Sequence, residues 1–239
     1  MAFKREWDSS CPRVWDTWQG DNGVTWVIRD LRPEDDETAL KILMEHLCTD
    51  ETLCKLSNLV DDPESKQGIY DFWKEYLKHR MSLGCYEEKD GQSKLVALNA
   101  CFVITKGEKS DDVILGKAWN NVYDALKVCD ANVDPFEVLG IDQILYAVGL
   151  VVQKDYRGAK LGARILAARE PLAVHHGILG TSTVFTGPAS QKSADRAGFT
   201  TVLTLTLKQL AEAGLDYPKD ENLNIKVMVK KYDSKTIKE

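Results

Sequence analysis

The sequence lacks several features that would place it outside the class of soluble globular proteins. Its longest apolar run, Ile144 to Val152, is about half of the roughly 20 residues that a membrane helix needs. The first residues carry no apolar core of a signal peptide, and the six cysteines form no C-x-x-C pair. We therefore expect a cytoplasmic protein with free thiols and without a membrane partner.

Positive charge and histidine are also scarce. The net charge is −6, and the chain has only 4 histidines. An acidic balance argues against binding to the phosphate backbone of a nucleic acid, and so few histidines give a metal site little support. A small cationic partner is compatible with this charge.

What the sequence does contain is the composition of a globular domain. Of its 239 residues, 44% are hydrophobic, which suffices for a full core, and no repeat or long linker divides them. We expect a single domain over residues 1–239, with a core over about 24–232, an N-terminal extension over 1–23 and a flexible tail over 233–239. The oligomeric state stays open, with a monomer favoured.

Hydrophobic periodicity predicts strands and helices in mixed order. Strands are expected over residues 25–29, 85–88, 95–105, 143–152, 181–185, 199–207 and 226–230. Helices are expected to begin at Pro33 and to cover about 65–83, 117–127, 161–172 and 189–197. Residues 14–19 fit either an edge strand or aromatic packing of a frayed N-terminus, and the second interpretation is favoured.

A glycine-punctuated turn follows the apolar strand that ends at Val152. It runs from Tyr156 to Arg164 and leads into a helix, whose first N–H groups are free to bind phosphate. Arg157 adds a cation, and two glycines permit close approach of a ligand to the backbone. A purely structural turn explains the pattern equally well, and neither the dinucleotide fingerprint nor the P-loop is present.

The stretch Arg157 to Gly162 resembles the acyl-CoA loop, Arg/Gln-x-x-Gly-x-Gly/Ala, of the Gcn5-related N-acetyltransferase superfamily. Lys160 replaces the usual central glycine. The surrounding order of strand, loop, helix, strand, short helix and Ala197-Gly198-Phe199 turn also matches. More narrowly, the chain resembles the insect arylalkylamine N-acetyltransferase-like proteins from about residue 25 to 230. That resemblance rests on residues 32–35, 49–51, 156–158 and 190–199.

The resemblance implies an α/β fold of the α+β type, with a mixed central sheet of about seven strands flanked by helices and splayed at the acetyl-CoA site. It implies an acetyl-CoA-dependent transferase that acetylates the primary amine of a small arylalkylamine or polyamine by direct, base-assisted attack on the thioester. Two alternatives are a non-catalytic acyl-CoA-binding module and a protein or peptide N-acetyltransferase.

The same resemblance assigns site residues. Glu34 is implied as the general base, acting through ordered water, although compensation of the helix dipole would also explain it. Backbone N–H groups of Leu150, Val151 and Val152 are expected to lie along the pantetheine and hold the carbonyl. The pyrophosphate is expected on the backbone amides of Arg157, Gly158, Ala159, Lys160, Leu161, Gly162 and Ala163.

The proton donor to the leaving thiolate is harder to assign. Many members of the superfamily use a tyrosine at the position of Ala194, whereas insect relatives carry serines that align with Ser190 and Thr186. Each hydroxyl is either a helix cap or a catalytic group, and Ser190 is also a candidate for ordering CoA. Asp50 and Glu51 either attract the cationic substrate or form a solvated pair at the end of a helix.

Overall fold

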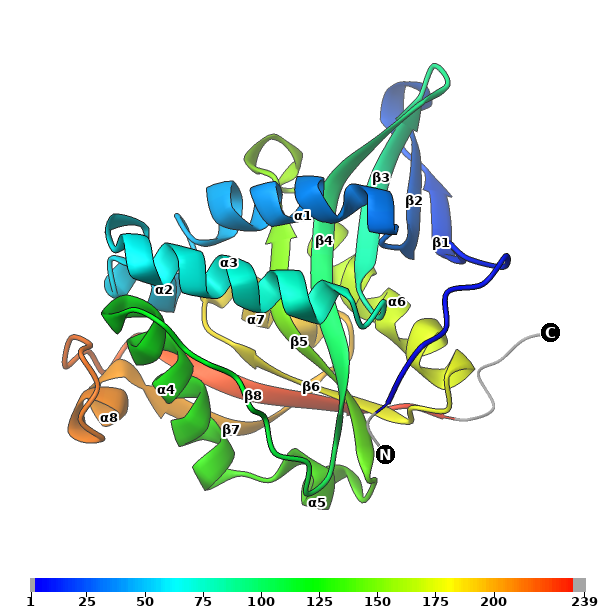
Figure 1. Ribbon diagram of the computed structural model, residues 1–239. Helices are drawn as coiled ribbons and strands as arrows, with labels where there is room; N and C mark the ends of the chain where they lie inside the picture. Colours follow the sequence, from blue (N-terminus) through cyan, green and yellow to red (C-terminus); the bar gives the residue numbers. More distant parts are fainter. Residues whose placement is uncertain (1–2, 234–239) are drawn as a thin grey trace.

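In the computed structural model, which describes residues 3–233, eight strands form one sheet (Figure 1). Their order is β1-β2-β3-β4-β5-β6-β8-β7, and only β5 and β6 are parallel neighbours. The strands are β1 (Val14–Gln19), β2 (Thr25–Asp30), β3 (Leu83–Lys89), β4 (Gln92–Thr105), β5 (Gln143–Val152), β6 (Gly180–Phe185), β7 (Thr200–Thr206) and β8 (Asn224–Lys231).

Helices cover both faces of this sheet. The α-helices are α1 (Asp36–Ile42), α2 (Thr52–Leu56), α3 (Pro63–Leu77), α4 (Lys117–Asn132), α5 (Pro135–Leu139), α6 (Leu161–His175), α7 (Pro188–Arg196) and α8 (Leu207–Glu212). Short 3-10 turns are η1 (Asp21–Gly23), η2 (Pro33–Asp35), η4 (Leu59–Asp61) and η5 (Lys154–Tyr156), and η3 (Leu43–Leu47) is a π-helical turn. Over residues 3–233, no helix is both long and apolar enough to cross a bilayer.

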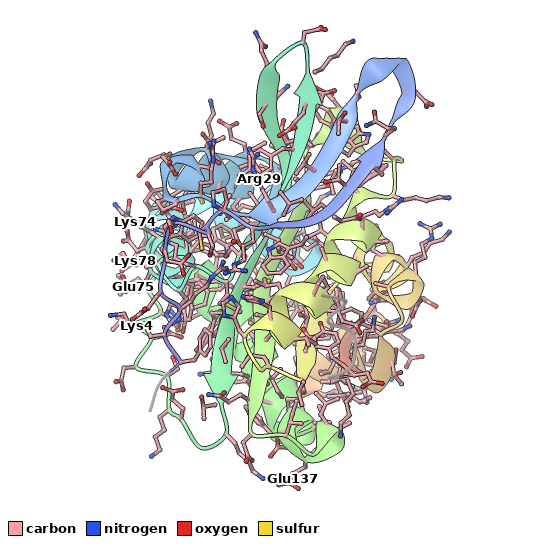
Figure 2. The ribbon with its side chains drawn as sticks, turned by 90° about the vertical axis from the view of Figure 1, so that its right-hand side faces the viewer. Lys4, Arg29, Lys74, Glu75, Lys78 and Glu137 are labelled. Carbon is pink, nitrogen blue, oxygen red and sulfur yellow. The ribbon has the colours of Figure 1, made fainter. Side chains whose placement is uncertain are left out.

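The two faces have separate apolar clusters because side chains alternate along β4. Leu98 and Ala100 pack with α1, α3 and α4, whereas Ala97 and Cys101 pack with α6. Helix α3 shows the matching amphipathic pattern, with Trp73 buried against the sheet. In Figure 2, Lys74, Glu75 and Lys78 of the same helix lie along the outer left edge, away from α6.

The mixed sheet and the flanking helices confirm the predicted α/β class. The interpretation of residues 14–19 as a frayed segment was wrong, because they form β1 and pair antiparallel with β2. The sheet therefore has eight strands rather than about seven. Of the predicted tail, residues 234–239 lie outside the described residues.

Asp30 explains why the N-terminal segment is held in place. Its buried carboxylate accepts hydrogen bonds from both terminal nitrogens of Arg5, from the Arg13 backbone N–H at 2.8 Å and from Trp15 Nε1 at 2.8 Å. Arg5 also donates to the Arg80 carbonyl oxygen at 2.7 Å. A buried ion pair with this many hydrogen bonds fixes the path of the chain into β1.

Replacement of Asp30 should therefore destabilise the whole fold. Asp30→Ala would leave the buried Arg5 guanidinium without its anion, which costs about 3–5 kcal/mol. Urea unfolding monitored by tryptophan fluorescence measures the loss. The matched control is Asp16→Asn, which breaks the more exposed pair with Arg164 and should cost less than about 1 kcal/mol. Equal losses in the two variants would contradict the role of Asp30.

Candidate active site

Strands β5 and β6 separate soon after they meet. Their parallel register comprises Leu145 with Thr181 and Tyr146 with Ser182. Beyond that point β5 stays paired with β4, and β6 stays paired with β8 as far as Phe185. A cavity of about 470 Å³ lies at the ends of the separated strands, and we call it the outer cavity.

The predicted loop forms one wall of the outer cavity. The residues predicted to bind the cofactor that line it are Leu150, Val151, Val152, Arg157, Gly158, Lys160, Leu161, Gly162 and Ser190. Ala159 and Ala163 were also predicted to contact the ligand, but they do not line the cavity. Because α6 begins at Leu161, its first N–H groups lie at this wall.

The backbone of the loop explains why glycine is usual where this chain has Lys160. Lys160 has φ 60°, in the left-handed region, and Gly158 has φ 91°. A non-glycine residue in that region costs on the order of 1–2 kcal/mol. Gly162 has a different role, because a Cβ there would lie 3.3 Å from Ser193 Oγ on α7. The substitution at 160 thus adds a cation at a conformational cost.

Positive side chains surround the start of α6. Arg157, Lys160, Lys192 and Arg196 line the outer cavity, and this excess of cations beside free helix amides suits a phosphate group. Arg157 is already engaged, since its Nη1 lies 2.5 Å from Asp50 Oδ2 and its Nε donates to the Val152 carbonyl oxygen. A ligand phosphate would compete with Asp50 for this guanidinium.

Glu51 lies at the inner end of the outer cavity. One carboxylate oxygen accepts the Leu53 N–H at 3.0 Å, and the other accepts the Cys54 N–H at 2.7 Å, so Glu51 caps α2. The Thr186 hydroxyl donates to the same carboxylate from the other side of the cavity. The π-helical turn over 43–47 directly precedes this segment and brings Leu47 and His46 to the cavity wall.

Glu34 lies elsewhere. It is exposed in the 3-10 turn at the start of α1 and does not line the outer cavity. Its neighbour Asp35 is bound in a structural network by Arg32 and Tyr86. Burial of Asp35 acts to raise its pKa, but these hydrogen bonds outweigh burial and hold the pKa below its ordinary value. The structure thus does not bring the predicted base to the other predicted site residues.

Both predicted hydroxyl residues do lie at the cavity. Gly187 is the N-cap of α7, and Ser190 Oγ donates to the Gly187 carbonyl oxygen at 2.9 Å, so Ser190 is not a cap. Thr186 contacts Glu51 instead of capping the helix. Ala194 is fully buried in a small apolar cluster and does not line the cavity.

A second, smaller cavity adjoins the first. This inner cavity has a volume of about 120 Å³ and shares Leu47, Glu51, Leu150, Thr186 and Ser190 with the outer cavity. Its walls are mainly apolar and include four aromatic residues, Trp73, Trp119, Tyr146 and Phe185. Among the described residues that line it, Glu51 is the one charged side chain. The two cavities therefore meet at a carboxylate and two hydroxyl groups.

No protein-family model and no curated protein sequence matches the chain, but solved structures do. The first has a provisional assignment as arylalkylamine N-acetyltransferase 7 of the mosquito Aedes aegypti, with 28% identity, 96% of this chain and 99% of the other covered, and a TM-score of 0.89. This chain is an arylalkylamine N-acetyltransferase-like member of the Gcn5-related N-acetyltransferase superfamily.

Two further structures share the fold of this N-acetyltransferase-like chain at lower identity. Arylalkylamine N-acetyltransferase 2 of Aedes aegypti is 16% identical over 86% of this chain and 98% of its own, with a TM-score of 0.74. A polyamine N-acetyltransferase of Drosophila melanogaster, described as forming N-acetylagmatine, is 16% identical over 86% and 99%, with a TM-score of 0.69.

In this N-acetyltransferase-like chain, the sequence did not reveal the importance of the position of Glu51. The motif Thr49-Asp50-Glu51 supported the resemblance, yet its acidic pair was given no role beyond attraction of a substrate or solvation. The signal was the place of the pair, between the π-helical turn η3 and the short helix α2. His46 also lines the outer cavity, and its buried Nδ1 has no hydrogen-bond partner within residues 3–233.

Because Arg157 and Asp50 form an ion pair, substitution of one should change the affinity for CoA in the opposite direction to substitution of the other. Asp50→Asn should tighten CoA binding about two- to five-fold, because it releases the guanidinium and removes a negative charge from the cavity. Arg157→Ala should weaken binding roughly ten-fold. Isothermal titration with CoA measures both changes. Weaker binding in both variants would indicate that the pair only supports the loop.

Proposed function

We propose that this acyltransferase transfers the acetyl group of acetyl-CoA to a small primary amine, with Glu51 as the general base. The observation that carries the proposal is the junction of the two cavities. A cation-lined cavity that suits a phosphorylated thioester meets an aromatic cavity that suits an amine, and Glu51 lies where they join.

The outer cavity fits CoA in its chemistry. The pyrophosphate would lie on the amides at the start of α6, beside Arg157 and Lys160, and the pantetheine would follow residues 150–152 toward Glu51. Since β5 and β6 are apart there, backbone groups of β5 are available to a ligand where a strand would otherwise pair with them.

The proposed reaction is a direct transfer. A primary amine with a pKa near 10 arrives as an ammonium, and the Glu51 carboxylate accepts one of its protons. The nitrogen lone pair then forms a bond to the thioester carbonyl carbon, the C–S bond breaks, and its electron pair leaves on sulfur. A second proton, lost from the nitrogen after the C–N bond forms, neutralises the thiolate, with Ser190 as the proposed relay. The Thr186 hydroxyl holds Glu51 in place.

The inner cavity favours an aromatic acceptor over a polyamine. A cavity of about 150 Å³ in a protein core holds one benzene molecule, so about 120 Å³ suits a single ring. A second ammonium group would be buried without a carboxylate. Leu126, Tyr146 and Val148 also line a third cavity of about 750 Å³, where Asp112 and Asp130 lie, so this wall separates the inner cavity from those acids.

The role of Glu51 can be separated from that of Glu34 by two matched variants. Glu51→Gln should lower kcat about 100-fold or more, because a general base contributes 10²–10⁴-fold, while acetyl-CoA still raises Tm. Glu34→Gln should leave kcat within about two-fold, because Glu34 lies away from the junction. Thiol release from acetyl-CoA in the presence of an amine measures both.

Two results would count against this assignment, and a third measurement is a control for folding. A collapse of activity in Glu34→Gln, with Glu51→Gln active, would restore Glu34 as the base. Binding of acetyl-CoA without turnover of any amine would favour the non-catalytic acyl-CoA-binding module. Because Glu51 also caps α2, a loss of Tm in Glu51→Gln large enough to unfold the protein at assay temperature would remove the meaning of its kcat, so Tm is measured in parallel.

Acceptor choice provides a further prediction. A phenylethylamine should have a kcat/KM at least about ten-fold above that of spermidine, since burial of a second charge is unfavourable. Tyr146→Ala should narrow this ratio by joining the inner cavity to the acid-lined third cavity, whereas Tyr146→Phe, which keeps the wall, should not. Preference for spermidine in the native protein would refute the assignment of the inner cavity to an aromatic group.

A further inference from the structure

Strand β5 carries a bulge where it lines the inner cavity. Asn99 of β4 pairs with Leu150 of β5, and Cys101 pairs with Ala147. The two pairs are therefore two residues apart on β4 but three residues apart on β5. The additional β5 residue falls between these two pairs. Carbonyl groups at a bulge lose their regular ladder partners and must be satisfied by other donors.

Two side chains supply these donors. Trp73 Nε1, from α3, donates to the Val148 carbonyl oxygen at 2.8 Å, and Asn99 Nδ2 donates to the Gly149 carbonyl oxygen at 2.7 Å. A peptide unit is planar, with its C=O and N–H groups on opposite sides. A carbonyl held in one direction therefore also sets the direction of the N–H in the same unit, which belongs to Gly149 in the first case and to Leu150 in the second.

Arg169 of α6 determines how Asn99 is oriented. Its Nε donates to Asn99 Oδ1 at 2.6 Å, and its Nη1 donates to the hydroxyls of Thr183 at 2.9 Å and Thr181 at 3.2 Å. A guanidinium can only donate, so the amide oxygen of Asn99 must face Arg169 and the amide nitrogen is left for Gly149.

The electrostatic situation of Arg169 is unusual. The side chain is fully buried, its hydrogen-bond partners are neutral, and its Nη2 has no partner within residues 3–233. A buried cation without a carboxylate partner is costly for stability. The same cation favours negative charge that develops nearby in a site shielded from water.

We propose that Trp73 and Asn99, the latter oriented by Arg169, are positioning residues for acetyl transfer. Asn99 holds the Gly149 carbonyl so that the N–H group of Leu150 points to the carbonyl oxygen of the bound thioester, and Trp73 holds the preceding peptide unit of the bulge. Both residues line the inner cavity. This inference rests on the proposed binding of acetyl-CoA, and the buried guanidinium of Arg169 adds stabilisation as negative charge forms on that oxygen.

The variant Asn99→Asp tests the role with little change in shape. A carboxylate still accepts the hydrogen bond of Arg169, but it cannot donate to the Gly149 carbonyl oxygen. In the infrared spectrum of acetyl-CoA labelled with ¹³C at the thioester carbonyl, we expect the native protein to shift the bound carbonyl band to lower frequency. The variant should lose most of this shift. Its kcat should fall about ten-fold or more, with KM for acetyl-CoA changed less than about three-fold.

Two further variants separate positioning from general stability. Thr181→Val removes one hydrogen-bond partner of Arg169 but leaves the hydrogen bond between Asn99 and Gly149. The carbonyl band of bound acetyl-CoA and the kcat of this variant should therefore equal those of the native protein, even if its Tm falls. Trp73→Phe keeps a ring but removes the donor to Val148, and it provides a second test if Asn99→Asp does not fold. It should show a smaller band shift and a lower kcat.

The outcomes distinguish this inference from the proposed function. A native band position and native kcat in both Asn99→Asp and Trp73→Phe would overturn the inference while acetyl-CoA binding stands. A loss of kcat in Thr181→Val equal to that in Asn99→Asp would also overturn it, since stability alone would then explain both. If the native protein binds no acetyl-CoA, no bound band appears, and the proposed function falls together with the inference.

Discussion

The parallel ladder between β5 and β6 ends after Tyr146, and the arrangement of the site depends on that ending. Each strand keeps its other neighbour, so the sheet opens without coming apart. An opening inside a sheet leaves polar backbone groups that need partners. Side chains from both sides of the sheet meet part of this need at the β5 bulge, and a ligand can meet the rest. The outer cavity and the aromatic inner cavity are the two approaches to this opening.

The parts of the fold that the sequence predicted well are those determined by neighbouring residues. The apolar run that forms β5, the glycine turn after it and helix α6 all follow from local spacing. The left-handed backbone at Lys160 also explains why glycine is usual at this position, although it does not explain the lysine. Strand β1 was not predicted with equal success, since its attachment depends on a buried contact between Arg5 and Asp30. Periodicity carries no information about such a contact.

The candidate site shows the same limit more sharply. Glu34 and Glu51 are both acidic residues at the beginning of a helix, and the dipole argument applies to each. What distinguishes them is the approach of Thr186, which is 135 residues distant from Glu51 in the chain. Sequence reasoning could place Ser190 and Thr186 near one helix, but it could not show which carboxylate they would meet. Only the approach of the connection between β6 and α7 to the start of α2 decides that.

The strand order has a consequence for how the chain reaches this structure. The final strand, β8, lies between β6 and β7 rather than at an edge. During synthesis from the N-terminus, β7 thus has no neighbour in the sheet until residues 224–231 leave the ribosome. The half of the sheet that carries Thr186 and Ser190 is therefore completed last, through contacts of high sequence separation that form slowly. A nascent chain can complete the loop over residues 156–164 before it completes the other wall of the outer cavity.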